Sequence, residues 1–161
     1  MIRPAEDGDL GAIERMWNHV VRTSLATFNS KEKTHAEIAA TLRERRDAGH
    51  AVLVADRGDG PIAFGMYFQF RGGLGYQHTL EHTIIVDEAA KGQGIGRVLL
   101  TALEDHARAA GHHSLFAGVS GRNPDGRAFH AAMGYIEVVM LKEVGRKWDQ
   151  WLDLHLMQKF L

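Results

Sequence analysis

The feature that most constrains this chain is a glycine-rich turn between an apolar segment and an amphipathic one. Ile84–Val86 form a short apolar run, and residues 91–97 read Lys-Gly-Gln-Gly-Ile-Gly-Arg. From Ile95 onward, apolar residues recur at helical spacing until Gly111 interrupts the pattern. The sequence therefore predicts a strand, a turn and a helix in that order, with the helix N-terminus at the glycines.

Such a turn is suited to binding an anion. A helix N-terminus offers unpaired N–H groups and about half a positive charge. Glycines let a phosphate approach the backbone, and Lys91 and Arg97 add charge at the rim. Three glycines at a helix start cost stability, so a connection without a ligand would leave them unexplained.

Two common phosphate-binding motifs do not fit. A P-loop has its lysine after the glycines, whereas Lys91 precedes them here. A dinucleotide fingerprint needs Gly-x-Gly-x-x-Gly near a domain start, whereas Gly92, Gly94 and Gly96 are spaced by two and lie in mid-chain.

The rest of the chain predicts a mixed α/β sheet with helices on its faces. A length of 161 residues without repeats or linkers indicates one domain, residues 1–161. Alternating or continuous apolar runs predict strands, and helical spacing with capping residues predicts helices. The expected strands are 1–3, 52–55, 62–68, 77–86, 115–119, 136–141 and 152–157, and the expected helices are 10–21, 35 to just before Gly49, 95–110 and 124–133.

Composition excludes several functions. The chain has no cysteine, so disulfides, thiolate metal sites and a cysteine nucleophile are excluded. A net charge of −1 offers no overall electrostatic footprint for nucleic acid. No apolar run approaches the roughly 20 residues of a membrane-spanning helix, and the N-terminus does not read as a signal or transit peptide, so a cytoplasmic location is expected. The His78/His82 and His112/His113 pairs lack a well-spaced third ligand, and no metal site is expected.

The glycine turn resembles the Arg/Gln-x-x-Gly-x-Gly/Ala signature of the GNAT family of N-acetyltransferases, with Lys91 in the basic slot. More narrowly, Glu-His-Thr at 81–83 and Trp-Leu-Asp-Leu at 151–154 resemble the phosphinothricin and methionine sulfoximine acetyltransferases. The resemblance implies a largely antiparallel sheet of six to seven strands with about four helices, splayed in mid-sheet where acyl-CoA inserts. It also implies acetyl-CoA as co-substrate, with no metal, and a homodimer.

The same resemblance assigns the residues that hold acetyl-CoA. Strand backbone groups would meet the pantetheine arm, the glycine turn would cradle the pyrophosphate, and an asparagine at the next helix start would bind the pantetheine. A serine that the family often has three residues after this asparagine is Gly126 here. The set comprises Ile84, Ile85, Val86, Lys91, Gly92, Gln93, Gly94, Ile95, Gly96, Arg97 and Asn123.

Without a cysteine, direct attack of an amine on the thioester is the economical mechanism, and it needs a base, an acid and dipoles for the thioester oxygen. Glu81 is the candidate base, because a carboxylate in a buried strand has a raised pKa. The resemblance also supports this role. Thr83 shares its face, and His82 faces the other way. The alternative is a salt-bridged or solvent-facing glutamate on an edge strand.

His130 is the second catalytic candidate. It follows Asn123 by seven residues, which places both near one helix face. The resemblance puts a histidine where the wider family has a tyrosine that protonates the thiolate, and imidazole suits either an acid or a base. Tyr135 is an alternative acid, and a buried histidine without a chemical role is the other possibility.

The acceptor side is defined by the resemblance. It matches Arg71 to a residue that would hold an acidic substrate group, for which a guanidinium is suited, although a solvated loop arginine would look the same. Lys147 and Trp148 are expected in a loop between the last two strands, and Trp151 and Leu152 are candidates for a dimer contact. The remaining acceptor-side candidates are Phe28, Tyr76 and Thr83.

The expected activity is transfer of acetyl from acetyl-CoA to the α-amine of a small amino acid or analogue. The alternatives are acetylation of another amine, such as a polyamine, an antibiotic or a protein N-terminus, and a non-catalytic acyl-CoA-binding domain.

Overall fold

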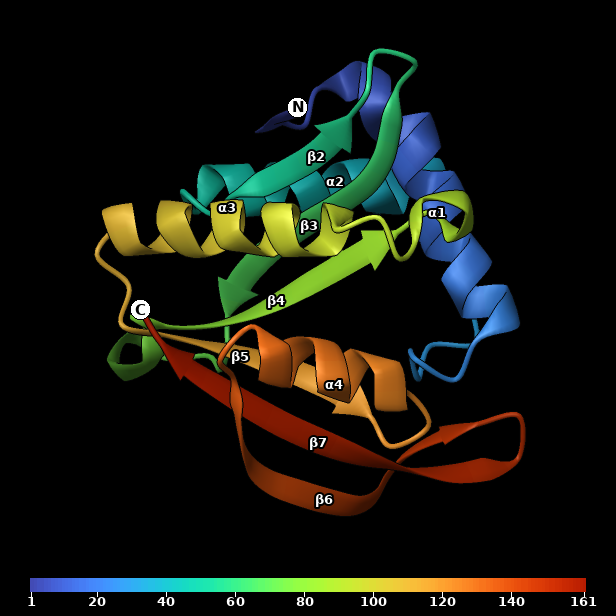
Figure 1. Ribbon diagram of the computed structural model, residues 1–161, viewed down its shortest axis with the longest axis vertical. Coiled ribbons are helices and arrows are strands. Elements are labelled where there is room, and N and C mark those ends of the chain that lie inside the picture. The colour runs from blue at the N-terminus through green and yellow to red at the C-terminus, as the bar shows by residue number, and fades with distance from the viewer.

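The computed structural model describes all 161 residues. A seven-stranded sheet runs through the molecule in the order β1-β2-β3-β4-β5-β7-β6. Helices α1 and α2 cover one face, and α3 and α4 cover the other (Figure 1). The elements are β1 (Ile2–Pro4), α1 (Leu10–Thr23), α2 (His35–Asp47), β2 (Val52–Asp56), β3 (Pro61–Gln69), β4 (Thr79–Val86), α3 (Ile95–Ala109), β5 (Ser114–Ser120), α4 (Pro124–Ala132), β6 (Ile136–Lys147) and β7 (Gln150–Phe160), with short 3-10 turns at Asp7–Asp9, Leu74–Tyr76 and Glu88–Ala90.

The predicted fold class is confirmed, because every pair of neighbouring strands is antiparallel except β4 and β5. None of the helices combines the length and apolar character that crossing a membrane requires.

Two hydrophobic cores lie on opposite faces of the sheet. Ile13 and Trp17 of α1 pack with Phe64 of β3 on one face, whereas Leu99 and Leu103 of α3 belong to the core on the other. This division follows from the pleat, which points successive side chains of a strand to opposite faces. In β4, Ile84 packs toward the α3 core and Ile85 toward the α1 core.

The sheet forks between β4 and β5. These strands are paired only from Thr79↔Ser114 to Glu81↔Phe116. Beyond that point β4 stays paired with β3 and β5 stays paired with β7, each to its end. Residues 82–86 of β4 therefore have no strand partner on the β5 side, which is the mid-sheet splay that the resemblance implies.

The last hairpin differs from the sequence expectation. The strand expected to end at residue 141 continues to Lys147 after an irregularity between Leu141 and Gly145. Only Trp148 and Asp149, both with positive φ, form the turn. The prediction that Lys147 lies in a loop is therefore wrong. The reason is that β6 is an edge strand, exposed along most of its length, so no buried face imposes an alternating pattern.

Candidate active site

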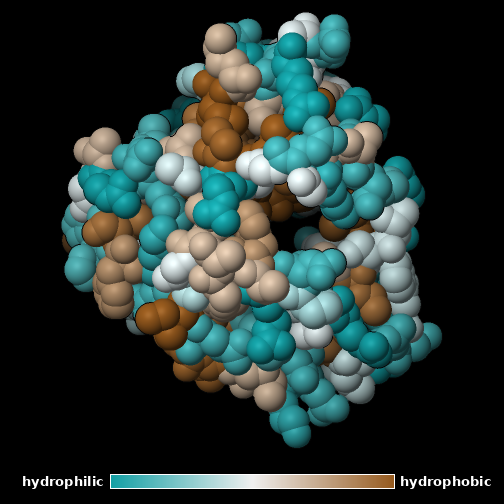
Figure 2. Space-filling model, viewed as in Figure 1, coloured by the Kyte–Doolittle hydropathy of each residue, from teal (hydrophilic) through white to brown (hydrophobic).

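A cavity of about 770 Å³ opens at the fork of the sheet. That volume falls within the range typical of small-molecule sites. Its walls come from α1, the last residues of β4, the glycine turn with the start of α3, and α4, and Figure 2 shows the molecule hollowed between these parts. Most of the expected cofactor set lines it, namely Ile84, Ile85, Val86, Lys91, Gly92, Gly94, Ile95, Gly96, Arg97 and Asn123.

The glycine turn places the start of α3 in the wall of this cavity. Gly92 and Gly94 have φ of 73° and 78°, in the left-handed region that glycine adopts without steric cost. Gly94 is the N-cap of α3, and no side chain caps the helix there. The N-terminal N–H groups and the positive end of the helix dipole are thus available to an anion.

The third glycine serves packing. A Cβ at Gly96 would lie 3.4 Å from the ring of Phe129 on α4. A side chain at this position would press against that ring. Gly96 therefore allows the start of α3 and α4 to approach each other at the cavity.

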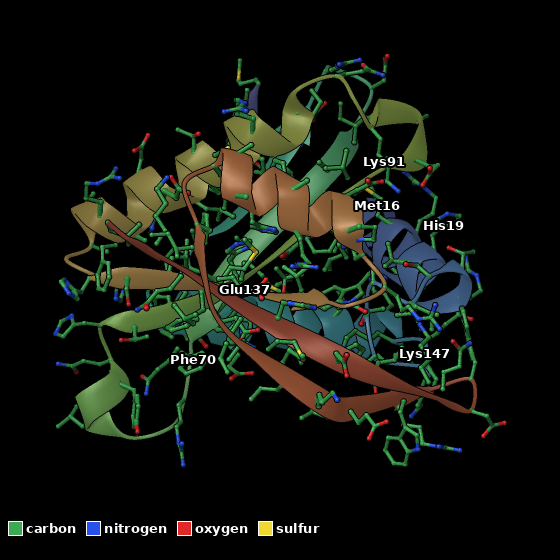
Figure 3. The ribbon with its side chains drawn as sticks, turned by 60° about the horizontal axis from the view of Figure 1, so that its bottom comes forward. Met16, His19, Phe70, Lys91, Glu137 and Lys147 are labelled. Atoms are coloured by element: carbon green, nitrogen blue, oxygen red, sulfur yellow. The ribbon has the colours of Figure 1, made fainter.

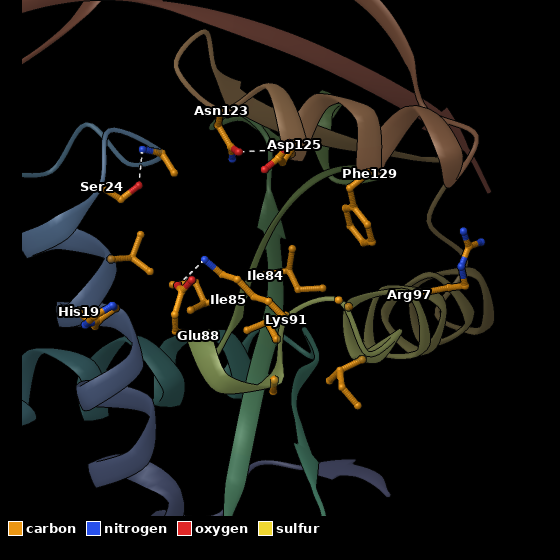
Figure 4. Close-up of a pocket in the computed structure, with 18 of the residues that line it drawn as sticks. His19, Ser24, Ile84, Ile85, Glu88, Lys91, Arg97, Asn123, Asp125 and Phe129 are labelled. Atoms are coloured by element: carbon orange, nitrogen blue, oxygen red, sulfur yellow. Dashed lines mark hydrogen bonds and ion pairs between the residues drawn. The ribbon is translucent and has the colours of Figure 1, made fainter.

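The polar side chains of the turn differ in their orientation (Figure 4). Lys91 Nζ donates to Glu88 Oε2 at 2.6 Å, and both residues line the cavity. Arg97 has no ion-pair partner and lies on the first turn of α3. Gln93 does not line the cavity, because its amide donates to the Ala89 carbonyl at 2.9 Å and accepts from Arg57 at 2.7 Å. Gln93 therefore has only its backbone to offer a ligand.

Asn123 caps α4, and Gly126 makes room for it. The Oδ1 of Asn123 accepts from the Gly126 backbone N–H at 2.9 Å. A Cβ at Gly126 would overlap the Asn123 amide. Glycine in place of the expected serine thus fits this conformation of Asn123, whose Nδ2 remains free for a ligand.

His130 lines the cavity, and its lowered pKa favours the neutral ring. Its Nδ1 contacts the Gly126 carbonyl at 2.7 Å. Because a carbonyl only accepts, the proton lies on Nδ1 and the lone pair on Nε2. Nε2 is buried without a partner, and burial lowers the pKa of His130. In this state His130 accepts a proton at Nε2 and donates one there only after protonation.

Behind His130 lies a buried polar cluster that the sequence did not reveal. The rings of His82 and Tyr135 lie 5.1 Å and 5.4 Å from the His130 ring. Glu104, which pairs with Lys159 at 2.6 Å, completes the cluster. Burial lowers the pKa of His82 to about 3, and burial with the nearby Glu104 raises that of Tyr135. Both side chains are therefore neutral, and neither lines the cavity.

Glu81 lies on the opposite face of β4 from this cluster, at the fork itself. Phe68 of β3 and Phe116 of β5 flank it in the sheet register. Burial raises the pKa of Glu81 above the ordinary glutamate value, and its carboxylate forms no ion pair. Glu81 is therefore neither salt-bridged nor on an edge strand. Thr83 shares its face, as expected, one step nearer the glycine turn.

Other expected acceptor-side residues do not line the cavity. Arg71 and Tyr76 lie together in the loop between β3 and β4, with the guanidinium 5.7 Å from the ring centroid. Phe28 packs against Gly145 of β6, where any Cβ would overlap the ring. The sequence missed the residues that α1 and its following loop contribute to the cavity, which include His19, Thr23 and Ser24.

Lys147 is buried and holds the hairpin to the end of α1. It is 2% exposed. Its Nζ donates to the carbonyls of Val21 and Ser24 at 2.7 Å each, and of Thr27 at 3.2 Å. Figure 3 shows it where the hairpin passes α1. Lys147 is thus not a rim residue, and burial lowers its pKa.

Replacing Lys147 with methionine is expected to lower the free energy of unfolding by about 2–4 kcal/mol, because three carbonyls lose a charged donor. Urea denaturation would measure the loss. Lys142→Met, on the exposed part of the same strand, is the control. Equal stability of the two variants would contradict this role of Lys147.

Comparison with known proteins agrees with this geometry. The model of the Acetyltransferase (GNAT) family matches residues 13–135. An L-methionine sulfoximine/L-methionine sulfone acetyltransferase from Salmonella typhimurium is 32% identical over 98% of this chain and 92% of its own length.

Two solved structures are also similar. A phosphinothricin acetyltransferase from Sinorhizobium meliloti in complex with AcCoA has a TM-score of 0.96 and 29% identity, covering 100% of this chain and 88% of the other. A ribosomal-protein-alanine N-acetyltransferase from Brucella melitensis has a TM-score of 0.97 and 37% identity, covering 100% and 99%. The chain belongs to the GNAT family and is an acetyl-CoA-dependent N-acetyltransferase.

Proposed function

We propose that this protein acetylates the α-amine of a small amino acid or amino-acid analogue of the phosphinothricin or methionine sulfoximine type. The observation that carries the proposal is the fork, which has a helix start without a side-chain cap on one side and a half-buried carboxylate without an ion pair, Glu81, at its base. The similar enzymes from Salmonella and Sinorhizobium, named for these substrates, support the choice of acceptor.

The residues at the cavity suit acetyl-CoA. The N–H groups at Gly94 and beyond would hold the pyrophosphate, with Lys91 and Arg97 adding positive charge. The unpaired edge of β4 at residues 84–86 would hydrogen-bond the pantetheine arm, and Asn123 Nδ2 would meet it from α4. When bound there, acetyl-CoA supplies the acetyl group as a thioester.

Glu81 and His130 divide the proton transfers. Glu81 takes a proton from the acceptor ammonium, which frees the nitrogen lone pair for attack. As the C–N bond forms and the C–S bond breaks, His130 Nε2 accepts the second proton of the nitrogen and passes it to the departing sulfur. The N–H of His130 Nδ1 stays on the Gly126 carbonyl throughout and fixes the ring.

A panel of amines tests this function. The rate of thiol release from acetyl-CoA would be measured with amino acids and their analogues, polyamines, aminoglycosides and a peptide with an N-terminal alanine. We expect kcat/KM to be highest for methionine sulfoximine, methionine sulfone or phosphinothricin. The peptide with an N-terminal alanine is included because the similar Brucella protein is named a ribosomal-protein-alanine N-acetyltransferase. A preference for that peptide would overturn the proposed substrate.

Arg71 is proposed to hold the acceptor carboxylate. Arg71→Ala is expected to raise KM about tenfold or more for amines that carry a carboxylate, through loss of a charge-assisted pair, and to leave KM for simple amines unchanged. Steady-state kinetics across the same panel measure this. A uniform rise for all amines would remove Arg71 from substrate recognition.

We also propose a homodimer formed through β6. This strand is the edge of the sheet, and such edges expose unpaired backbone groups. Its exposed apolar side chains are Ile136, Val138, Val139, Met140, Leu141 and Val144. An apolar edge of this length favours cover by a second chain. Sedimentation equilibrium is expected to give the mass of two chains, and a one-chain mass at micromolar concentration would contradict the dimer.

A further inference from the structure

Gly118 is a glycine in the interior of a strand where the backbone does not require one. It lies within β5, and its φ is not positive. Glycine in a strand interior weakens the strand, since it adds no side chain to pack and loses more conformational entropy than other residues. The reason for a glycine at position 118 is that another group occupies the space that a side chain there would need.

That space is filled by the carboxylate of Glu81. A Cβ at Gly118 would lie 2.9 Å from Glu81 Oε1 and 3.6 Å from Leu154 Cδ1. The first distance is shorter than real Cβ contacts, so either the carboxylate or the strand would have to move. The observed conformation of Glu81 therefore depends on the absence of a side chain at Gly118.

Gly118 lies at the start of the fork, which relates this contact to the site of the reaction. Glu81 pairs with Phe116, which is the last paired residue of β5 on the β4 side. Gly118 lies two residues further along the same face, where the strands have already parted. The carboxylate thus leans across the start of the fork. Gly118 is exposed, although Ala117 and Val119 beside it are buried, so this point of the sheet is open on the α1 side.

We propose that Gly118 is a positioning residue. The absence of a side chain there leaves the space that the Glu81 carboxylate occupies as it extends across the fork to the incoming amine. The inference rests on the proposed role of Glu81 as the base. It assigns the glycine to the reaction and not to the stability of β5.

Gly118→Ala tests the inference. We expect kcat for the best amine to fall about 10- to 100-fold, part of what a general base contributes, with KM for acetyl-CoA within about twofold because the residue lies outside the acetyl-CoA cavity. The acidic limb of the pH–rate profile should move to lower pH, since the displaced carboxylate is less desolvated.

The melting temperature of Gly118→Ala should not fall below that of the wild type. Gly11→Ala, at an exposed site with nothing within 4 Å of the added Cβ, is the control and should retain full activity.

A double variant separates the inference from the proposed function. In the Glu81→Gln background, Gly118→Ala should add less than about a twofold loss, because residues that act as a unit are not additive. If Glu81→Gln alone leaves kcat unchanged, the proposed base is wrong. If Glu81→Gln is slow but Gly118→Ala is as fast as the wild type, the base stands and the inference is overturned. An equal loss of kcat from Gly118→Ala in the wild-type and Glu81→Gln backgrounds would also overturn the inference. So would a Gly118→Ala chain that does not fold, because the Glu81 side chain is expected to move and make room for the new methyl group.

Discussion

Replacing Glu81 with glutamine is expected to lower kcat by about 10²- to 10⁴-fold, the contribution typical of a positioned general base. Glutamine keeps the shape of the side chain but cannot accept the ammonium proton. The affinity for acetyl-CoA should stay within about twofold, because Glu81 does not line the cavity at the glycine turn. Steady-state kinetics and calorimetry on the same preparation would measure the two quantities.

The pH dependence adds a second readout. Burial raises the folded-state pKa of Glu81, so the base is protonated and inactive over a wider acidic range than an ordinary glutamate. The wild-type rate should therefore rise with pH through a midpoint above 4.5, the ordinary value. In Glu81→Gln, this rise of the rate with pH should be absent. Glu44→Gln, at an exposed position on α2, is the control. An unchanged kcat in Glu81→Gln would exclude this base.

Replacing Gly94 with valine is expected to weaken coenzyme A binding by about 10- to 100-fold. The residue has φ of 78°, and a β-branched side chain in that region costs of order 1–3 kcal/mol. The turn would relax away from this conformation and redirect the N–H groups at the start of α3. Isothermal titration with coenzyme A measures the change.

Gly111→Val is the matched control for this substitution. Gly111 follows the other end of α3 with φ of 81°, and a Cβ at either glycine meets nothing within 4 Å. Both variants carry similar backbone strain and should lose similar stability, but only Gly94→Val alters the anion site. Equal weakening of coenzyme A binding in the two variants would mean that strain, and not the geometry of the turn, governs affinity.

The parts of the site that the sequence predicted are the local ones. Helical spacing, a glycine N-cap and the preceding apolar run all lie within about fifteen residues of Gly94, so short-range rules describe them. The faces of β4 also followed from the pleat, which correctly placed Glu81 and His82 on opposite sides.

The parts that the sequence did not predict depend on long-range packing. Lys147 takes its acceptors from residues 21–27, more than a hundred positions away, and nothing local to β6 signals this. The cluster around His82 draws on β4, α3 and the segment after α4. Gln93 is held away from the cavity by Arg57, from the turn after β2, which donates to its amide oxygen.

Binding of coenzyme A is the measurement closest to the central claim, which is that the glycine turn and the forked strands form one acyl-CoA site. Titration calorimetry of the protein with coenzyme A should show saturable heat with one site per chain, and the melting temperature should rise with ligand concentration. Absence of both heat and thermal stabilisation at millimolar coenzyme A would contradict the account.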